Sequence, residues 1–93
     1  MIHELKTHPQ YFSLVSSNKK RFEVRKNDRN FQVHDLVTLK EFMPEVIFEG
    51  GVSAAHYTGR KLCMKIGFVL HGGAFGILEG YCVLSLSRVF NYQ

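Results

Sequence analysis

The stretch RKLCMKIGFVL, residues 60–70, decides the fold class of this chain. Its larger apolar side chains stand at every second position, which is the period of a β-strand that buries one face. We therefore expect a strand over residues 60–70 with these apolar side chains directed into a core: Leu62, Met64, Ile66 and Phe68.

A second strand of the same kind follows on its C-terminal side. Residues 81–87 alternate again, with Cys82, Leu84 and Leu86 predicted to face inward. The intervening GGAFG at residues 72–76 is a glycine-rich turn. It is not a phosphate-binding loop, because it lacks both the GK[ST] ending and a helix after it.

A short strand and one helix are predicted at the N-terminal end. Residues 2–6 alternate as a strand, and THPQ at residues 7–10 is typical of a helix start with Thr7 as its cap. Asn18 is expected to end the helix in the left-handed conformation. The helix should pack on the core through apolar residues at helical spacing, namely Tyr11, Phe12, Leu14 and Val15.

Two further strands are predicted in the middle of the chain. Residues 21–25 alternate strictly, which indicates that Phe22 and Val24 face the core. The other strand spans residues 36–42, after a turn at His34 and Asp35. The polar outer face of the first of these strands would consist of Arg21, Glu23 and Arg25.

The segment from residue 43 to residue 59 shows no clear period and contains Pro44 and a Gly50–Gly51 pair. We expect a loop there, and a loop of this length is either functional or mobile. About five strands and one N-terminal helix, in a single domain of residues 1–93, predict a mainly β (α+β) fold. A small mixed β-barrel suits these elements best, since closure removes exposed strand edges.

Composition narrows the class of protein. Ninety-three residues with 45% hydrophobic and 22% charged content build one core and are not typical of a disordered chain. The start MIHELKTH has no apolar signal-peptide segment, and no apolar run approaches the roughly 20 residues of a membrane helix. We therefore expect a cytoplasmic protein without membrane contact.

The two cysteines, Cys63 and Cys82, are expected to be free thiols on opposite faces of their strands. The five histidines lack metal-ligand spacing, so neither a metal nor a cofactor is predicted.

The net charge of +4 is concentrated in one short segment. Residues 19–29 hold six basic and two acidic side chains, a formal +4, while the rest of the chain balances. This asymmetry favours an anionic partner. The alternative is a basic strand edge that only deters aggregation.

The segment NKKRFEVR, residues 18–25, resembles the GxKxxExR motif of the ASCH domains, a branch of the PUA-like superfamily. Lys20, Glu23 and Arg25 fill its three polar positions, and Asn18 stands at the glycine. Other pieces resemble one compact bacterial and phage family of that group: HELK at residues 3–6, FEVRKNDRNF at 22–31, QVHD at 32–35, YTGR at 57–60 and EGYCVLSL at 79–86, with His34 where glycine is common.

This resemblance implies a PUA-like barrel with a cleft beside residues 18–25 and a role in binding RNA. We expect RNA or a nucleotide as the ligand, single-stranded or looped, because no recognition helix is visible. Glu23 either orients Arg25 through an ion pair or accepts from a base edge or sugar hydroxyl. Tyr57 either stacks on a base or packs over the barrel mouth. The predicted nucleic-acid-binding set is Lys20, Glu23, Arg25, Lys26, Arg29, Tyr57 and Arg60.

Two other functions stay open beside binding, which is the preferred interpretation. Some small ASCH proteins resemble amidohydrolases of N4-acylated cytidine, which use a lysine, a hydroxyl residue and a carboxylate. Lys20 matches the lysine, but Glu23 occupies the hydroxyl position and Glu79 matches the carboxylate only by chain order. A different hydrolysis would use Glu23 to activate water and Lys20 to stabilise an oxyanion. The apolar stretch at residues 42–48 leaves three alternatives open, namely packing back on the barrel, a homodimer or contact with a protein partner.

Overall fold

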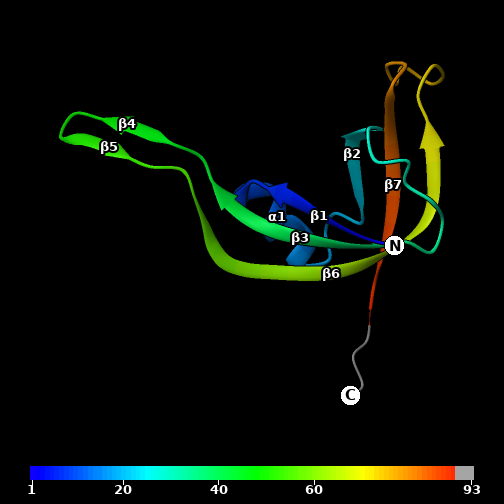
Figure 1. Ribbon diagram of the computed structural model, residues 1–93, viewed down its shortest axis with the longest axis horizontal. Helices are drawn as coiled ribbons and strands as arrows, with labels where there is room; N and C mark the ends of the chain where they lie inside the picture. Colours follow the sequence, from blue (N-terminus) through cyan, green and yellow to red (C-terminus); the bar gives the residue numbers. More distant parts are fainter. Residues whose placement is uncertain (90–93) are drawn as a thin grey trace.

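One curled sheet, one helix and a projecting hairpin make up residues 1–89, the part of the chain that the computed structural model describes (Figure 1). The fold is mainly β, as predicted. In chain order the elements are β1 (Ile2–Thr7), α1 (Pro9–Ser16), β2 (Phe22–Lys26), β3 (Leu36–Met43), β4 (Val46–Phe48), β5 (Gly51–Ser53), β6 (His56–His71) and β7 (Tyr81–Arg88).

The main sheet has the strand order β1-β3-β6-β7-β2. Strands β1 and β3 are parallel and the other neighbours are antiparallel, so the sheet is mixed, as predicted. It curls into a half-barrel, and among the described residues no backbone ladder joins its edges β1 and β2. Side chains bridge that gap instead: Arg25 Nη2 donates to the Lys6 carbonyl at 2.7 Å, and Arg29 Nη1 donates to the Glu4 carbonyl at 2.7 Å. The expectation of full closure by the strands was therefore wrong.

Strand β6 is long because it pairs with two different strands of the curled sheet, one along each part of its length. Its first part pairs with β3 and its second with β7, and the register shifts between Ile66 and Phe68. A bulge of this kind inserts one residue and turns the following side chains to the other face. Val69 is therefore buried and Phe68 exposed, which corrects the prediction that Phe68 faces the core. The inward positions of Met64 and Ile66 are confirmed.

The core lies where α1 packs against the sheet. Phe12 and Val15 supply the helix's buried face, and Cys82, Leu84 and Leu86 point inward from β7, as predicted. Tyr11 and Leu14 of the predicted helical stripe are exposed instead. The remaining buried apolar side chains are Leu5, Phe31, Val37, Leu39, Met64, Ile66 and Val69.

The N-terminal end of α1 differs from the prediction. His8 is the N-cap residue, and it makes no side-chain capping bond. Thr7 is still part of β1, and its buried hydroxyl accepts a 3.3 Å hydrogen bond from Arg25 Nη2. The predicted threonine cap is therefore wrong, because this hydroxyl is drawn into the contact between β1 and β2.

The C-terminal end of α1 confirms the prediction for Asn18, which has a φ of 67°. The Lys19 amide donates to the Leu14 carbonyl at 2.9 Å, and the Asn18 amide donates to the Val15 carbonyl at 3.0 Å. This pair of bonds is a Schellman motif, which needs a left-handed residue at the position of Asn18. The helix end thereby directs the chain into Lys20.

The aperiodic segment 43–59 is a hairpin arm and the start of β6, which corrects the predicted loop. Strands β4 and β5 pair antiparallel as a separate two-stranded sheet, with Glu49 and Gly50 at the turn. The arm projects away from the main sheet (Figure 1). It does not fold back over β2.

Two smaller expectations can be compared with the structure. Cys63 is exposed, Cys82 is buried, and both are free thiols. No helix within residues 1–89 combines the length and apolarity needed to cross a membrane.

Candidate functional site

Strand β2 presents Glu23 and Arg25 inward, the reverse of the prediction. The Glu23 side chain is buried, with the residue only 4% exposed, whereas Phe22 is 45% and Val24 52% exposed. A buried carboxylate is tolerated only when charged or hydrogen-bonding partners compensate for lost water. Glu23 meets that requirement because two cations contact it, one from each side.

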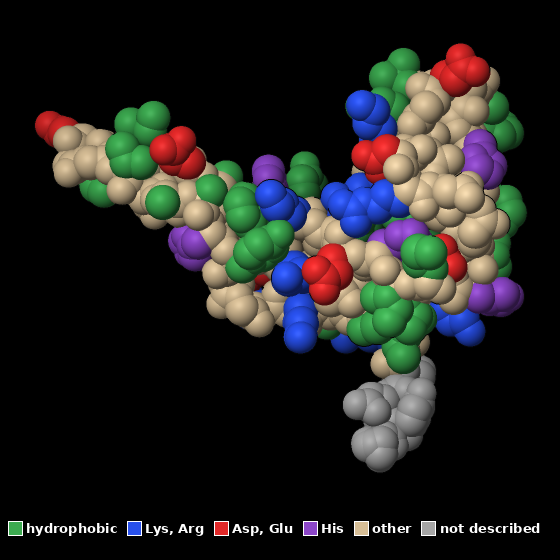
Figure 2. Space-filling model, viewed as in Figure 1, with side chains coloured by type: hydrophobic (Ala, Val, Ile, Leu, Met, Phe, Trp, Pro, Cys, Tyr) green, Lys and Arg blue, Asp and Glu red, His purple; other side chains and the backbone are tan. Residues whose placement is uncertain are grey.

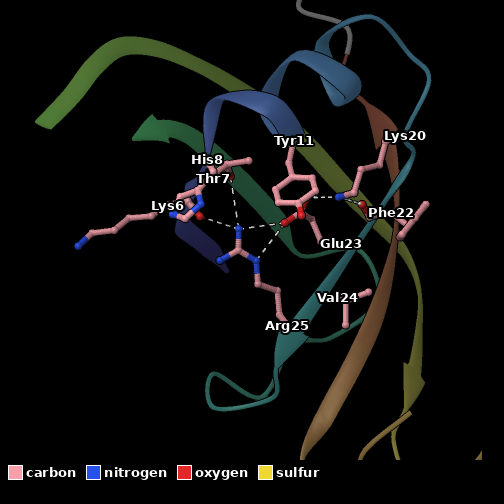
Figure 3. Close-up of a pocket in the computed structure, with 9 residues that line it drawn as sticks. All are labelled: Lys6, Thr7, His8, Tyr11, Lys20, Phe22, Glu23, Val24 and Arg25. Atoms are coloured by element: carbon pink, nitrogen blue, oxygen red, sulfur yellow. Dashed lines mark hydrogen bonds and ion pairs between the residues drawn. The ribbon is translucent and has the colours of Figure 1, made fainter. Parts of the chain in front are cut away.

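Lys20, Glu23 and Arg25 form one linked charge cluster (Figure 3). The Lys20 ammonium donates to Glu23 Oε2 at 2.7 Å and to the Phe22 carbonyl at 2.7 Å. On the other side, Arg25 Nε donates to Glu23 Oε1 at 3.0 Å. Glu23 is therefore a positioning residue: it fixes both cations, which is the ion-pair alternative predicted for it.

Arg25 also ties the cluster to the opposite edge of the sheet. Its Nη2 group bonds the Lys6 carbonyl and the Thr7 hydroxyl, both at the end of β1. Within residues 1–89, the Nη1 group of Arg25 has no protein acceptor, and only two of the three N–H donors of Lys20 are used. Both cations thus keep donors for a ligand.

The cluster lines a cavity of about 550 Å³ between β1, the start of α1 and β2. Lys20 and Arg25 face the one carboxylate of the lining, whereas the Lys6 side chain points away from it and its ammonium lies 4.6 Å from the centre of the Phe42 ring (Figure 3). Three cations and one carboxylate give the lining a formal charge of +2. Figure 2 shows Lys and Arg side chains gathered in the hollow between β1 and β2, the two edges of the curled sheet. The full lining is Lys6, Thr7, His8, Tyr11, Lys20, Phe22, Glu23, Val24 and Arg25.

Aromatic rings flank the cationic part of this cavity. The Lys20 ammonium lies 4.9 Å from the centre of the Phe22 ring and 5.6 Å from that of Tyr11. Both rings are about half exposed. Exposed rings beside cations can stack on a planar aromatic ligand while the cations bind its anionic part.

The other predicted binding residues lie outside this cavity. Lys26 and Arg29 line a neighbouring cavity of about 140 Å³, which Arg25 also touches. Tyr57 packs edge-on against Phe42, with ring centres 5.0 Å apart. The guanidinium of Arg60 lies 5.0 Å from the ring centre of Phe12 and 3.8 Å from Glu41. The structure therefore brings Lys20, Glu23 and Arg25 together and leaves Tyr57 and Arg60 apart from them.

Comparison of the sequence with known proteins shows which family the chain belongs to. The family described as "Domain of unknown function (DUF3850)" matches residues 2–86 of the chain. The chain belongs to this family. A protein of Escherichia phage P2, described as "Uncharacterized 12.9 kDa protein in GpA 3'region", is 42% identical to it over 65 residues. That match covers 70% of this chain and 50% of the phage protein, so the chain spans about half the length of this relative.

Sequence reasoning missed one wall of the cavity in this family member. Lys6, Thr7, His8 and Tyr11 come from the junction of β1 and α1. Tyr11 shares helical spacing with Leu14 and Val15, which assigns it to the core, so no sequence signal indicates that its ring faces the cavity. The approach of Lys6 to Arg25 had no sequence signal, since it depends on the curl of the whole sheet.

Glu79, the carboxylate considered for hydrolysis by chain order, does not line the cavity. It stands exposed in the turn between β6 and β7. Among residues 1–89 no group of three or more histidine, cysteine or acidic side chains could hold a metal ion.

Proposed function

We propose that this protein binds RNA or a nucleotide in the cytoplasm, with the cavity between β1, α1 and β2 as its binding site. One observation carries the proposal: Lys20, Glu23 and Arg25 lie together in a cavity of about 550 Å³. That volume falls within the range of about 300–1,000 Å³ that is typical of small-ligand sites.

The chemistry of the lining fits a nucleotide. A phosphate needs cationic donors, and Lys20 and Arg25 both keep unused N–H groups. A base needs an exposed aromatic face, and Tyr11 and Phe22 offer one beside those donors. Two cations share the single carboxylate Glu23, so the pairing leaves an excess of positive charge for an anion.

The resemblance to ASCH domains and the PUA-like superfamily is part of this proposal. It is supported by the contacts that link the three polar positions of the GxKxxExR motif. The left-handed φ of Asn18 adds support, because the motif's glycine stands at that position. Lys26 and Arg29, beside the smaller cavity, would contact further phosphates of a longer strand.

The test is a titration with single-stranded oligoribonucleotides, read by fluorescence anisotropy. Lys20→Ala should weaken binding by about 10- to 100-fold, the effect of losing one hydrogen bond to a charged group. Lys65→Ala is the matched control, because Lys65 is exposed on β6 and lines neither cavity. Equal affinities for the two variants, or no binding by the unmodified protein, would refute the proposal.

A hydrolase acting on a modified nucleoside is the second candidate, favoured by one contact. The Lys20 ammonium lies 2.7 Å from Glu23 Oε2 inside the cavity, a pairing that could polarise a carbonyl and activate water. Incubation with N4-acetylcytidine, followed by mass spectrometry, tests it. Loss of the acetyl group that stops in Lys20→Ala would favour catalysis over binding alone. An unchanged nucleoside would remove this candidate.

A further inference from the structure

The β4–β5 arm has an unusual combination of exposed apolar and acidic side chains. Residues 44–55 contain no lysine or arginine, and Glu45 and Glu49 are their only charged side chains. Figure 2 shows this pattern on the visible face of the arm, where hydrophobic and acidic groups dominate. The large apolar side chains of the arm are all exposed, with Ile47 at 78%: Val46, Ile47, Phe48 and Val52.

Within the part of the chain that the structure describes, neither face of the arm is covered. Ile47 and Val52 are register partners, so they share one face, while Val46 and Phe48 point to the other. An isolated two-stranded hairpin is at best marginally stable in water. Exposed apolar groups on both faces therefore indicate an arm that is buried against another molecule.

The negative charge of the arm indicates which kind of molecule covers it. Glu49 sits at the turn, where it would repel the phosphates of a nucleic acid. The complementary surface is one that combines cations with aromatic walls. The cavity beside β2 is such a surface, because Lys20 lies beside the rings of Tyr11 and Phe22 and the lining also includes Arg25 and the exposed Lys6.

We infer that the protein forms a two-fold dimer in which the arm of each copy inserts its tip into the β1–β2 cavity of the other. Phe48 packs between the aromatic walls, and Glu49 pairs with the cations of the second copy. Residues 44–55 place about six residues on each side of the arm, of which three pair as a strand, and at roughly 3.3 Å per residue the arm reaches about 20 Å from the sheet. Reciprocal insertion closes the assembly at two copies, since each arm and each cavity is used once.

Sedimentation velocity in the absence of RNA tests the dimer. At concentrations up to about 1 mM, the weak end of specific association, the mass should rise from the 10.7 kDa of one chain to twice that value. A mass of one chain throughout would overturn the inference. The arm would fill the cavity proposed for RNA, so dimerisation and RNA binding exclude each other. Because no nucleic acid is present, sedimentation tests the dimer whether or not the protein binds RNA.

Variants locate the contact. Phe48→Ser and Glu49→Lys should each weaken dimerisation at least tenfold. Phe75→Ser is the matched control, because Phe75 is also an exposed phenylalanine and lies in the turn between β6 and β7. A dimer that survives both arm substitutions would show that the arm is not the contact and would overturn the inference.

A charge exchange tests whether the arm meets the cavity. Lys6 is an exposed lining residue, and Lys6→Glu should weaken the dimer as Glu49→Lys does. Mixing the two variants should restore dimerisation, because every arm then faces a cavity of opposite charge. Weakening by arm variants alone, with no effect of Lys6→Glu and no restoration on mixing, would indicate arm-to-arm pairing and would contradict the insertion.

Discussion

Replacing Glu23 by glutamine removes the one carboxylate that Lys20 and Arg25 share. Breaking a buried ion pair by neutralising one partner typically costs about 3–5 kcal/mol. The Lys20 and Arg25 side chains are 16% and 25% exposed, so water compensates part of that loss. The glutamine also keeps one oxygen as an acceptor.

We therefore expect Glu23→Gln to lower the free energy of unfolding by about 2–3 kcal/mol. For a domain of this size, about 4–8 °C of Tm is lost per kcal/mol, so Tm should fall by about 10–20 °C. Urea denaturation followed by circular dichroism measures the first quantity, and a thermal scan measures the second.

Glu79→Gln is the matched control, because Glu79 is an exposed carboxylate in the turn between β6 and β7. It should change stability by no more than about 0.5 kcal/mol. Equal effects of the two substitutions would refute the reasoning, since the shared carboxylate would then contribute nothing that an exposed one does not.

Three further predictions concern the fold that supports the site. Asn18→Gly should be neutral or slightly stabilising in urea denaturation, whereas Asn18→Ala should cost about 1 kcal/mol because a Cβ disfavours the left-handed φ; the opposite order would contradict the Schellman geometry. The hydrogen bond from His3 Nε2, 2.8 Å from Asp35 Oδ2, holds the pKa of the Asp35 carboxyl below its usual 3.8 although burial opposes it. A lowered pKa contributes stability that is present above about pH 4 and lost as the pH falls through the folded-state pKa, so the acid limb of a pH–stability profile should flatten in Asp35→Asn. Gly72→Ala should lower stability by about 2 kcal/mol, because its Cβ would stand 1.9 Å from the Leu78 carbonyl oxygen; an unchanged Tm would show that the turn moves freely.

The sequence predicts the strands of the main sheet well where one face is apolar and the other polar. Residues 36–42, 60–70 and 81–87 all lie in observed strands. In residues 62–66 and 81–87 the alternation of apolar and polar side chains also identifies the inward face. Phe68 departs from its expected face because a bulge at Gly67 changes the phase of β6. An isolated glycine inside a strand pattern is a signal of such a bulge, and a count of alternating residues alone overlooks it.

Alternation fails to identify the inward face of β2 for a different reason. The pattern gives the period, but it assigns the polar side to water by default. Glu23 reverses that rule because two cations from nearby residues neutralise it in place. The arm was missed because both of its faces are exposed and apolar, so it shows no alternation at all.

The centre of the candidate site was predictable and its walls were not. Lys20, Glu23 and Arg25 are local in sequence, so a motif and a charge count locate them. Lys6 and Tyr11 reach the same cavity only through the parallel pairing of β1 with β3 and the curl of the sheet. Contacts of that kind join distant segments and leave no local pattern.

The most direct test of the account is the salt dependence of single-stranded RNA binding by the unmodified protein. Engagement of three or four phosphates predicts a log–log slope of about −2 to −3. The combined variant Lys20→Ala and Arg25→Ala should reduce the magnitude of that slope by about 1.4, two contacts at roughly 0.7 each. A slope near zero, or the same slope in both proteins, would contradict the claim that this cavity binds the phosphates.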